Sequence, residues 1–177
     1  MTIINGRACV VDGTPVDKVF SNGVQVYGRN LLQNSNFSRR NNYFNYTNAT
    51  GEIITVDNMT TLKIVTDNNA NVSNLGMFIP SYNLQISEPY SYQITIKSEV
   101  DGIIAYLGYQ GSLIANCKKI TLTTKWQTFK VNGELFTAGN SAFRIYGYRA
   151  STVYVTNLKL EQGDIATPWT PAPEDVM

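Results

Sequence analysis

The sequence contains no histidine among its 177 residues. Histidine is the commonest general base and transition-metal ligand, so its absence excludes Ser-His and Cys-His dyads and most transition-metal sites. A glycosidase needs two facing carboxylates instead, and most of the 13 acidic residues lie beside turn residues. Glu161 and Asp164, on either side of Gly163, are the pair that could approach each other. No phosphate loop, dinucleotide fingerprint or nucleophile elbow occurs, so we predict a non-enzymatic chain without a cofactor or a metal site.

Charge is also scarce. Charged residues make up 15% of the chain, well below the usual quarter, and the net charge is only +1. The longest basic runs are the pairs Arg39-Arg40 and Lys118-Lys119, which is too little for an electrostatic nucleic-acid footprint. No apolar stretch approaches the length of a membrane span, and the segment from Met1 to Gly6 lacks the pattern of a secretory signal. We therefore expect neither a nucleic-acid nor a membrane partner.

Cysteine is limited to Cys9 and Cys117, which lie far apart and in no metal-binding spacing. Both have apolar neighbours, which favours buried free thiols, although the sequence leaves their pairing open. A chain of this length can bury roughly 70% of the surface that its unfolded form exposes. It therefore needs no disulfide to fold.

Asn, Thr, Ser, Gly and Tyr take the place of charged residues, which suits polar strands joined by turns. In Tyr90–Ser98, tyrosines and isoleucines alternate with polar residues, and this period of two is typical of a half-buried strand. No long amphipathic helix is indicated. Many such segments separated by turn residues predict an all-β sandwich or barrel. The predicted strands are Glu52–Val56, Thr61–Thr66, Gly76–Pro80, Tyr90–Ser98, Ile103–Gln110, Lys118–Thr123, Gln127–Val131, Ala142–Arg149 and Val153–Glu161.

The two ends of the chain differ from its middle. Residues 1–28 contain Asn5-Gly6, Asp12-Gly13 and Asn22-Gly23, which favour the tight turns of antiparallel hairpins, so we predict a short N-terminal β-meander or hairpin there that serves as an attachment segment. Residues 29–166 form the predicted main domain, with a polar, aromatic loop from Ser38 to Gly51. Residues 167–177 are rich in proline, which cannot donate in an interior strand. This tail is either an extended segment on the surface or a linker.

The 11 tyrosines and 2 tryptophans suggest a sugar-binding surface, because aromatic rings stack on the apolar faces of sugars. Alternation in the segment 142–149 places Phe143 and Ile145 on one face and Arg144, Tyr146 and Tyr148 on the other. The first face is predicted to be core. The second face is either a ligand-binding stripe or ordinary cross-strand packing.

Two further segments extend this candidate site. Tyr106 and Gln110 would lengthen the stripe if the strand Ile103–Gln110 pairs with the segment 142–149. Tyr43 and Tyr46 lie in the predicted loop, and long loops often carry function. The other interpretation of that loop is that its aromatic residues cover an edge of the core.

The two tryptophans are assigned to structure rather than to sugar binding. Trp126 precedes a predicted strand, and large aromatic residues in such places more often belong to the core. Trp169 lies among the prolines of the tail, and we expect it to anchor the tail to the sandwich. Neither residue is therefore included in the predicted binding surface.

Three stretches together resemble a known module. The opening Val26 to Phe37, the strand start Lys125 to Phe129, and the closing strand and tail from Val153 to Asp175 are similar to carbohydrate-binding-module-like domains. These domains occur in tail and baseplate adhesion proteins of phages of lactic-acid and related Gram-positive bacteria. The closing stretch is the most specific of the three.

The resemblance implies a jelly-roll β-sandwich of two antiparallel sheets. It also implies a place in the phage tail of the virion, among other tail proteins, and host cell-wall polysaccharide as the ligand. Related modules often carry acids around a structural calcium where this chain has Ser38 and Asn157. This weakens the case for calcium, although main-chain oxygens could still hold one. Fold alone does not determine function, so a purely structural virion module that makes only protein contacts is the alternative hypothesis. A glycoside hydrolase is a weaker one.

Overall fold

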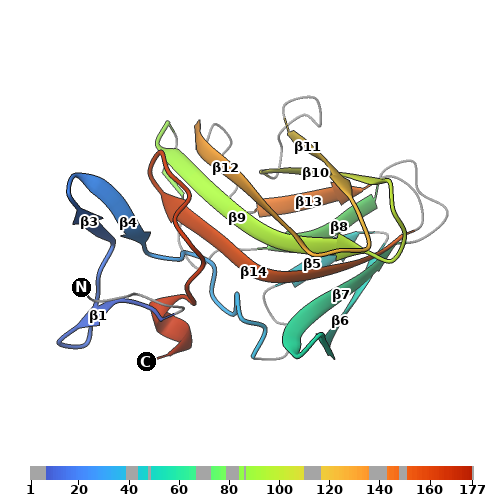
Figure 1. The fold of residues 1–177 in the computed structure, drawn as a ribbon, viewed down its shortest axis with the longest axis horizontal. Coiled ribbons are helices and arrows are strands. Elements are labelled where there is room, and N and C mark those ends of the chain that lie inside the picture. The colour runs from blue at the N-terminus through green and yellow to red at the C-terminus, as the bar shows by residue number, and fades with distance from the viewer. Residues whose placement is uncertain are drawn as a thin grey trace.

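The computed structural model shows a chain built almost entirely of antiparallel β-strands (Figure 1). It describes residues 7–38, 44–47, 49–66, 73–78, 84–85, 87–109, 117–135, 143–147 and 151–176. In 44–47, 73–78, 109, 143–144 and 146–147 only the backbone is described. Among the described residues, no helix is long and apolar enough to cross a membrane.

Two five-stranded sheets form the body of the molecule. Sheet I has the strand order β11-β10-β13-β8-β5, and sheet II has the order β12-β9-β14-β7-β6. The two sheets lie face to face, so the all-β sandwich expected from the alternation is confirmed. The strands of sheet I are β5 (Phe44–Thr47), β8 (Ser73–Phe78), β10 (Ile103–Tyr109), β11 (Lys118–Leu122) and β13 (Phe143–Gly147). The strands of sheet II are β6 (Ala49–Val56), β7 (Met59–Thr66), β9 (Pro89–Ser98), β12 (Gln127–Leu135) and β14 (Thr152–Gln162).

The core lies between the two sheets and is made of residues that alternate along the strands. Sheet I contributes residues such as Leu107 and Ile145, which are both fully buried. Sheet II contributes Tyr92, Ile94 and Ile96 from β9. Burying each of these side chains contributes roughly 1.5–3 kcal/mol, which makes this one contiguous cluster the main source of stability.

Two short ribbons precede the sandwich in the chain: β1 (Val10–Val11) pairs with β2 (Thr14–Pro15), and β3 (Lys18–Ser21) pairs with β4 (Val24–Gly28). The turns between them contain Asp12-Gly13 and Asn22-Gly23, all with positive φ, as the Asx-Gly signals predicted. The third signal, Asn5-Gly6, lies outside the described residues. The β3–β4 ribbon projects away from the sandwich (Figure 1). The predicted hairpin is therefore present, but in the described residues it is a sheet separate from β1–β2 rather than part of one meander.

Two sequence predictions about sheet positions are wrong. The segment from Ser38 to Gly51 is not all loop, because it contains β5 and the start of β6. The polar side of β9 is not open, because Ser91, Gln93 and Thr95 are buried. Strand β9 is flanked by β12 and β14, and the hydroxyl of Thr128 on β12 lies 2.9 Å from that of Thr95. Alternation shows which side is more apolar, but not whether the other side is covered.

Candidate functional site

The strand register of sheet I aligns one row of polar and aromatic positions across the whole sheet. Tyr106 of β10 is paired with Lys119 of β11 on one side and with Tyr146 of β13 on the other. Tyr146 is paired with Asn74 of β8, which is paired with Thr47 of β5. Four gaps of ~4.8 Å between neighbouring strands make this row about 19 Å long. We call these five positions the sheet I row.

The two members of the row whose side chains are described, Lys119 and Tyr106, lie on the outer face of the sandwich. Ala105 and Leu107, which flank Tyr106 in β10, are fully buried, and so is Ile145 beside Tyr146. Residues with the opposite parity are less covered: Tyr106 is half-buried, Ile104 is 37% exposed, and Lys119 is exposed. Because successive residues in a strand point to opposite faces, Tyr106 and Lys119 face away from the core, and the backbone register places Tyr146, Asn74 and Thr47 in line with them. The sequence pattern placed Tyr106 in the same stripe as Tyr146 only if their strands are neighbours, and β10 and β13 are indeed paired.

The predicted site residues fall into three groups. Tyr106 is fully described, and it is a direct register partner of Tyr146. Arg144 lies in β13, paired with Gly108 and Met77, and Tyr46 lies in β5, but the side chains of Arg144, Tyr146 and Tyr46 are outside the described part. Gln110, Tyr43 and Tyr148 lie outside the described residues altogether. Lys119, which the sequence analysis did not place in a site, is brought beside Tyr106.

One end of this face is closed by a half-buried cysteine. A Cβ built on Gly108 would lie 2.4 Å from Cys117 Sγ, so the thiol occupies the space that a side chain would need. Burial raises the pKa of the Cys117 thiol, and the charge of Glu134 adds to the effect. Neither Cys9 nor Cys117 is in a disulfide, as expected, but both are half-buried rather than buried.

A second aromatic cluster lies on the outer face of sheet II. Asp57 Oδ2 accepts hydrogen bonds from Lys97 Nζ and from Trp126 Nε1, both at 2.8 Å. The Lys97 ammonium also lies 4.8 Å from the centre of the Trp126 ring and 5.6 Å from that of Tyr154. Two hydrogen bonds lower the pKa of the Asp57 carboxyl: the one from Lys97 has the larger effect, and the one from Trp126 has the smaller. These four residues, which we call the Trp126 clamp, join the β6–β7 turn to β9, to β14 and to the residue that precedes β12.

The clamp corrects the prediction that Trp126 belongs to the core. Trp126 has the same parity as Thr128 and Lys130, whereas Phe129 and Val131 pack against the core. The ring is therefore half-buried on the outside. Its indole N–H and its stacking cation already have partners within the chain, so the cluster is better explained as a strap across sheet II than as an open sugar platform.

The tail packs on sheet II over two buried charges. Lys159 Nζ donates to Thr167 Oγ1 at 2.7 Å and to the Pro168 carbonyl at 2.9 Å, and it lies 3.7 Å from Glu161 Oε2. Glu161 accepts the backbone N–H of Thr167 at 2.6 Å and its hydroxyl at 2.8 Å. Burial lowers the pKa of Lys159 to about 8. We call Lys159, Glu161 and Thr167 the clasp. Glu161, one of the two acids considered for catalysis, is thus bound to other residues of the chain in a structural role.

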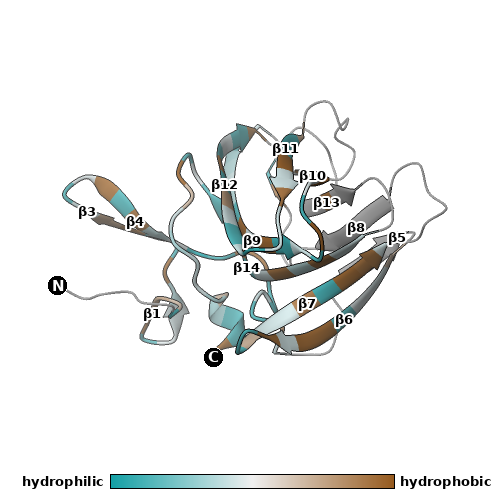
Figure 2. Cartoon of the chain, turned by 45° about the vertical axis from the view of Figure 1, so that its right-hand side comes forward, coloured by the Kyte–Doolittle hydropathy of each residue, from teal (hydrophilic) through white to brown (hydrophobic). Residues whose placement is uncertain are grey.

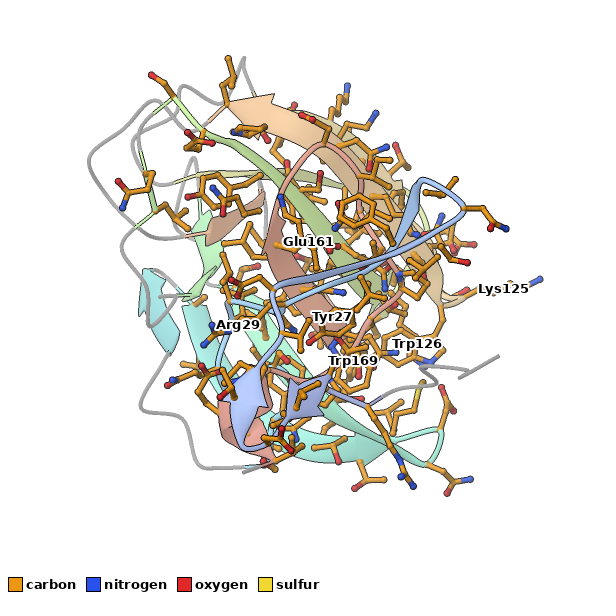
Figure 3. All side chains as sticks on the ribbon, turned by 90° about the vertical axis from the view of Figure 1, so that its left-hand side faces the viewer. Tyr27, Arg29, Lys125, Trp126, Glu161 and Trp169 are labelled. Atoms are coloured by element: carbon orange, nitrogen blue, oxygen red, sulfur yellow. The ribbon has the colours of Figure 1, made fainter. Side chains whose placement is uncertain are left out.

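The same clasp takes in the segment that enters the sandwich. The hydroxyl of Tyr27 accepts the N–H of Cys9 at 3.1 Å, and its ring lies 5.4 Å from Lys159 Nζ. Trp169 Nε1 donates to the Leu158 carbonyl at 3.1 Å, which is the tail anchoring that the sequence predicted. Figure 3 shows Tyr27, Glu161 and Trp169 on the side of the molecule that faces the two chain ends. Opening and closing segments therefore stabilise each other.

The described residues contain no group of three or more Cys, Asp or Glu side chains placed to hold a metal ion. Ser38 is exposed, and its N–H donates to Asn36 Oδ1. Asn157 has a φ of 50° at the bulge between Thr156 and Lys159. These are the two positions where related modules often carry calcium-associated acids. The absence of a cofactor stays a prediction from the sequence.

No protein-family model and no curated protein matches the chain, but many solved structures have its fold. A solved structure of an exo-β-agarase matches at a TM-score of 0.56 and 11% identity, over 78% of this chain and 26% of the agarase chain. TmCBM61, in complex with β-1,4-galactotriose, matches at 0.53 and 12% identity, over 76% of this chain and 99% of its own. The family 11 carbohydrate-binding module of Clostridium thermocellum Lic26A-Cel5E matches at 0.52 and 12%, over 76% and 94%.

These similarities show the fold. The chain has the β-sandwich architecture of the two carbohydrate-binding modules, and it matches about a quarter of the agarase chain. Identities of 11–12% carry no information on which sugar, if any, is bound, because fold and function are separable.

Proposed function

We propose that this chain is a non-catalytic carbohydrate-binding module and that the outer face of sheet I is its ligand-binding face. The observation that carries the proposal is the register that makes Tyr106 and Tyr146 direct neighbours on that face. Two neighbouring tyrosines offer ring area and hydroxyl groups to a sugar, and the amide and hydroxyl positions Asn74 and Thr47 continue the same row. The carbohydrate-binding modules with the same fold support this assignment.

The finer proposal is that the ligand is a host cell-wall polysaccharide and that the module belongs to a phage tail. Its support is the resemblance of the opening, middle and closing stretches to modules of phage adhesion proteins. The side-chain amide of Asn30 donates to the Thr170 carbonyl at 2.9 Å, so the opening and closing stretches share a structural role. A structural purpose is compatible with any use of the module, so the phage context rests on the sequence resemblance.

Binding is tested with the purified chain on isolated Gram-positive cell walls, by pull-down and by calorimetry with extracted polysaccharide. Tyr106→Ala and Tyr146→Ala are expected each to weaken binding by about two- to twelvefold, since stacking on a ring contributes on the order of 0.5–1.5 kcal/mol. Tyr154→Ala, on sheet II, is the matched control and leaves affinity unchanged. Unchanged binding in both sheet I variants would reject this face as the site.

The alternative, an attachment module that contacts only protein, is favoured by one feature. Phe20 and Val24 are each 59% exposed on the projecting β3–β4 ribbon, and Figure 2 shows apolar residues along that ribbon. A cavity of about 340 Å³ between the ribbon and the 163–165 turn is lined in part by Phe20, Val24 and Ile165. If the protein binds no glycan and Phe20→Ser abolishes its incorporation into particles, this alternative replaces the glycan proposal.

A further inference from the structure

The strands of sheet I are positively charged, whereas those of sheet II are mixed. Over the strand residues that the structure describes, sheet I has three basic residues, Lys118, Lys119 and Arg144, and no acidic residue. Sheet II has both signs in its strands: lysines at 63, 97, 130 and 159, and glutamates at 52, 134 and 161. The small net charge of the chain therefore hides an asymmetry between its two faces.

Two of the three basic residues occupy outer-face positions next to the tyrosines. Lys119 is the register partner of Tyr106, and it has the same parity as the exposed Thr121, opposite to the buried Ile120. Arg144 lies two residues before Tyr146 in β13, and so at a position of the same parity. The cationic and the aromatic positions of the sheet thus belong to one surface.

The lysine of this surface has its charge available. Among the described residues, Lys119 forms no ion pair, and its side chain is exposed. On sheet II, by contrast, Lys97 is paired with Asp57, and Lys159 is buried beside Glu161. A cation that needs no internal partner can contribute to the binding of an external anion.

We infer that the outer face of sheet I takes an acidic polysaccharide, a sugar chain that carries carboxylate or phosphate groups, rather than a neutral one. The tyrosines at 106 and 146 stack on the sugar rings, while Lys119 at one end of the sheet I row and Arg144 beside its centre pair with the acidic substituents. An arginine suits either anion because its fork of donors matches carboxylate and phosphate oxygens. This inference rests on the proposed function and specifies its ligand class.

The test uses two matched pairs of polymers that differ only in charge: polygalacturonate with its full methyl ester, and dextran phosphate with dextran. Binding of the whole chain is measured by calorimetry at 20 mM and 500 mM salt. We expect at least one acidic polymer to bind about ten times more tightly than its neutral partner at low salt. The difference is expected to shrink at high salt, because counterions screen charges that are exposed to solvent.

Two lysine variants test whether the preference for acidic polymers arises at the outer face of sheet I. Lys119→Gln is expected to lower the affinity for the acidic polymer about fivefold and to weaken its salt dependence. Lys125→Gln removes the same charge from the exposed turn before β12 and is expected to change affinity less than twofold. Equal losses in the two variants would mean that net charge, and not this face, attracts the polymer.

The remaining outcomes separate this inference from the proposed function. Equally tight, salt-independent binding of the neutral and acidic forms overturns the inference and leaves the carbohydrate-binding proposal standing. No binding to any of the four polymers or to cell-wall polysaccharide overturns both. A single-stranded oligonucleotide serves as a non-sugar polyanion, and binding to it as tight as to the acidic polymer would also overturn the inference.

Discussion

Gly28 and Glu161 lie so close together that no side chain fits between them. A Cβ built on Gly28 would lie 1.7 Å from Glu161 Oε2 and 2.8 Å from its carboxyl carbon. The carboxylate cannot move aside easily, because both its oxygens accept hydrogen bonds from Thr167 and Lys159 lies beside it. Glycine is required here for space, since the strand β4 ends at this residue where the chain passes under its own tail.

Gly28→Ala is therefore expected to destabilise the protein by about 3 kcal/mol, at the upper end of the usual cost of overpacking. The physical reason is that the methyl group displaces a buried, hydrogen-bonded carboxylate. The free energy of unfolding from urea titrations followed by tryptophan fluorescence measures the effect. Gly102→Ala is the control: nothing lies within 4 Å of its Cβ, and only its left-handed backbone (φ 87°) is strained, at a cost of roughly 1–2 kcal/mol. Equal losses in the two variants would contradict the packing argument.

Asn30 joins the opening of the domain to its closing strand and tail. Its Nδ2 donates to Ser35 and to the carbonyls of Leu158 and Thr170, and its Oδ1 accepts the N–H groups of Leu32 and Leu160. Asn30→Ala is expected to cost about 4 kcal/mol, because it leaves buried backbone groups without their partners. The measurement is the same urea titration, with a fall in the thermal midpoint as a second reading.

The matched control for this variant is another asparagine in the same segment. Asn36 Oδ1 accepts a single backbone N–H, from Ser38, near the surface. Asn36→Ala is therefore expected to cost less than about 1 kcal/mol. If Asn30→Ala were as mild as the control, the domain would be held at this point by packing alone.

The role of Asn30 also shows where prediction from the sequence stops. Its partners Leu158, Leu160 and Thr170 are 128 to 140 residues away in the chain, and a periodic pattern reports only on local structure. The strands of sheet II were predictable because their residues alternate over long runs, as in β9. The four-residue strand β5 was missed because Phe44–Thr47 offers too short a pattern and follows an asparagine-rich stretch.

The candidate site was predictable only in part, for the same reason. Alternation identified the aromatic faces of β10 and β13. That these two strands are neighbours could not be predicted from the sequence and is seen only in the three-dimensional structure. Lys119 was noticed in the sequence as one half of a basic pair too short for nucleic acid. Its register with Tyr106 depends on the antiparallel pairing of β10 and β11. The sequence of the lysine pair does not predict which residue of β10 lies beside Lys119.

The buried Lys159 predicts an unusual response to alkaline pH. Burial lowers its pKa from 10.5 to about 8 in the folded protein, so between these values the unfolded chain binds more protons than the folded one. Stability then rises with pH. The expected gain between pH 7 and pH 9.5 is about 2 kcal/mol, measured as an increase in the free energy of unfolding in urea.

The control for this pH response removes both buried charges. Lys159→Met combined with Glu161→Gln keeps the side-chain volumes similar, and such replacements are often close to neutral in stability. The rise with pH is expected to be absent in this double variant. Tyr27 and Cys117, whose pKa values are raised by burial, act in the opposite direction. Cys117 cancels in the difference, whereas Tyr27 loses the smaller contribution that Glu161 makes to its raised pKa. A rise of the same size in the double variant would show that another group causes it.

Trp126 is predicted to report the protonation of Asp57. The pKa of this carboxyl is held below its ordinary value by Lys97 first and by the Trp126 indole second, so the hydrogen bond persists above that lowered pKa and is lost as pH falls through it. The Nε1–H resonance of Trp126 should therefore shift at a pH below 3.8, the ordinary pKa of an aspartate. Trp169 is a built-in control in the same spectrum, because its Nε1–H donates to the Leu158 backbone carbonyl, which does not titrate. Asp57→Asn is expected to abolish the titration of the Trp126 signal while both indole signals stay dispersed, and a Trp126 signal that still titrates in this variant would contradict the clamp.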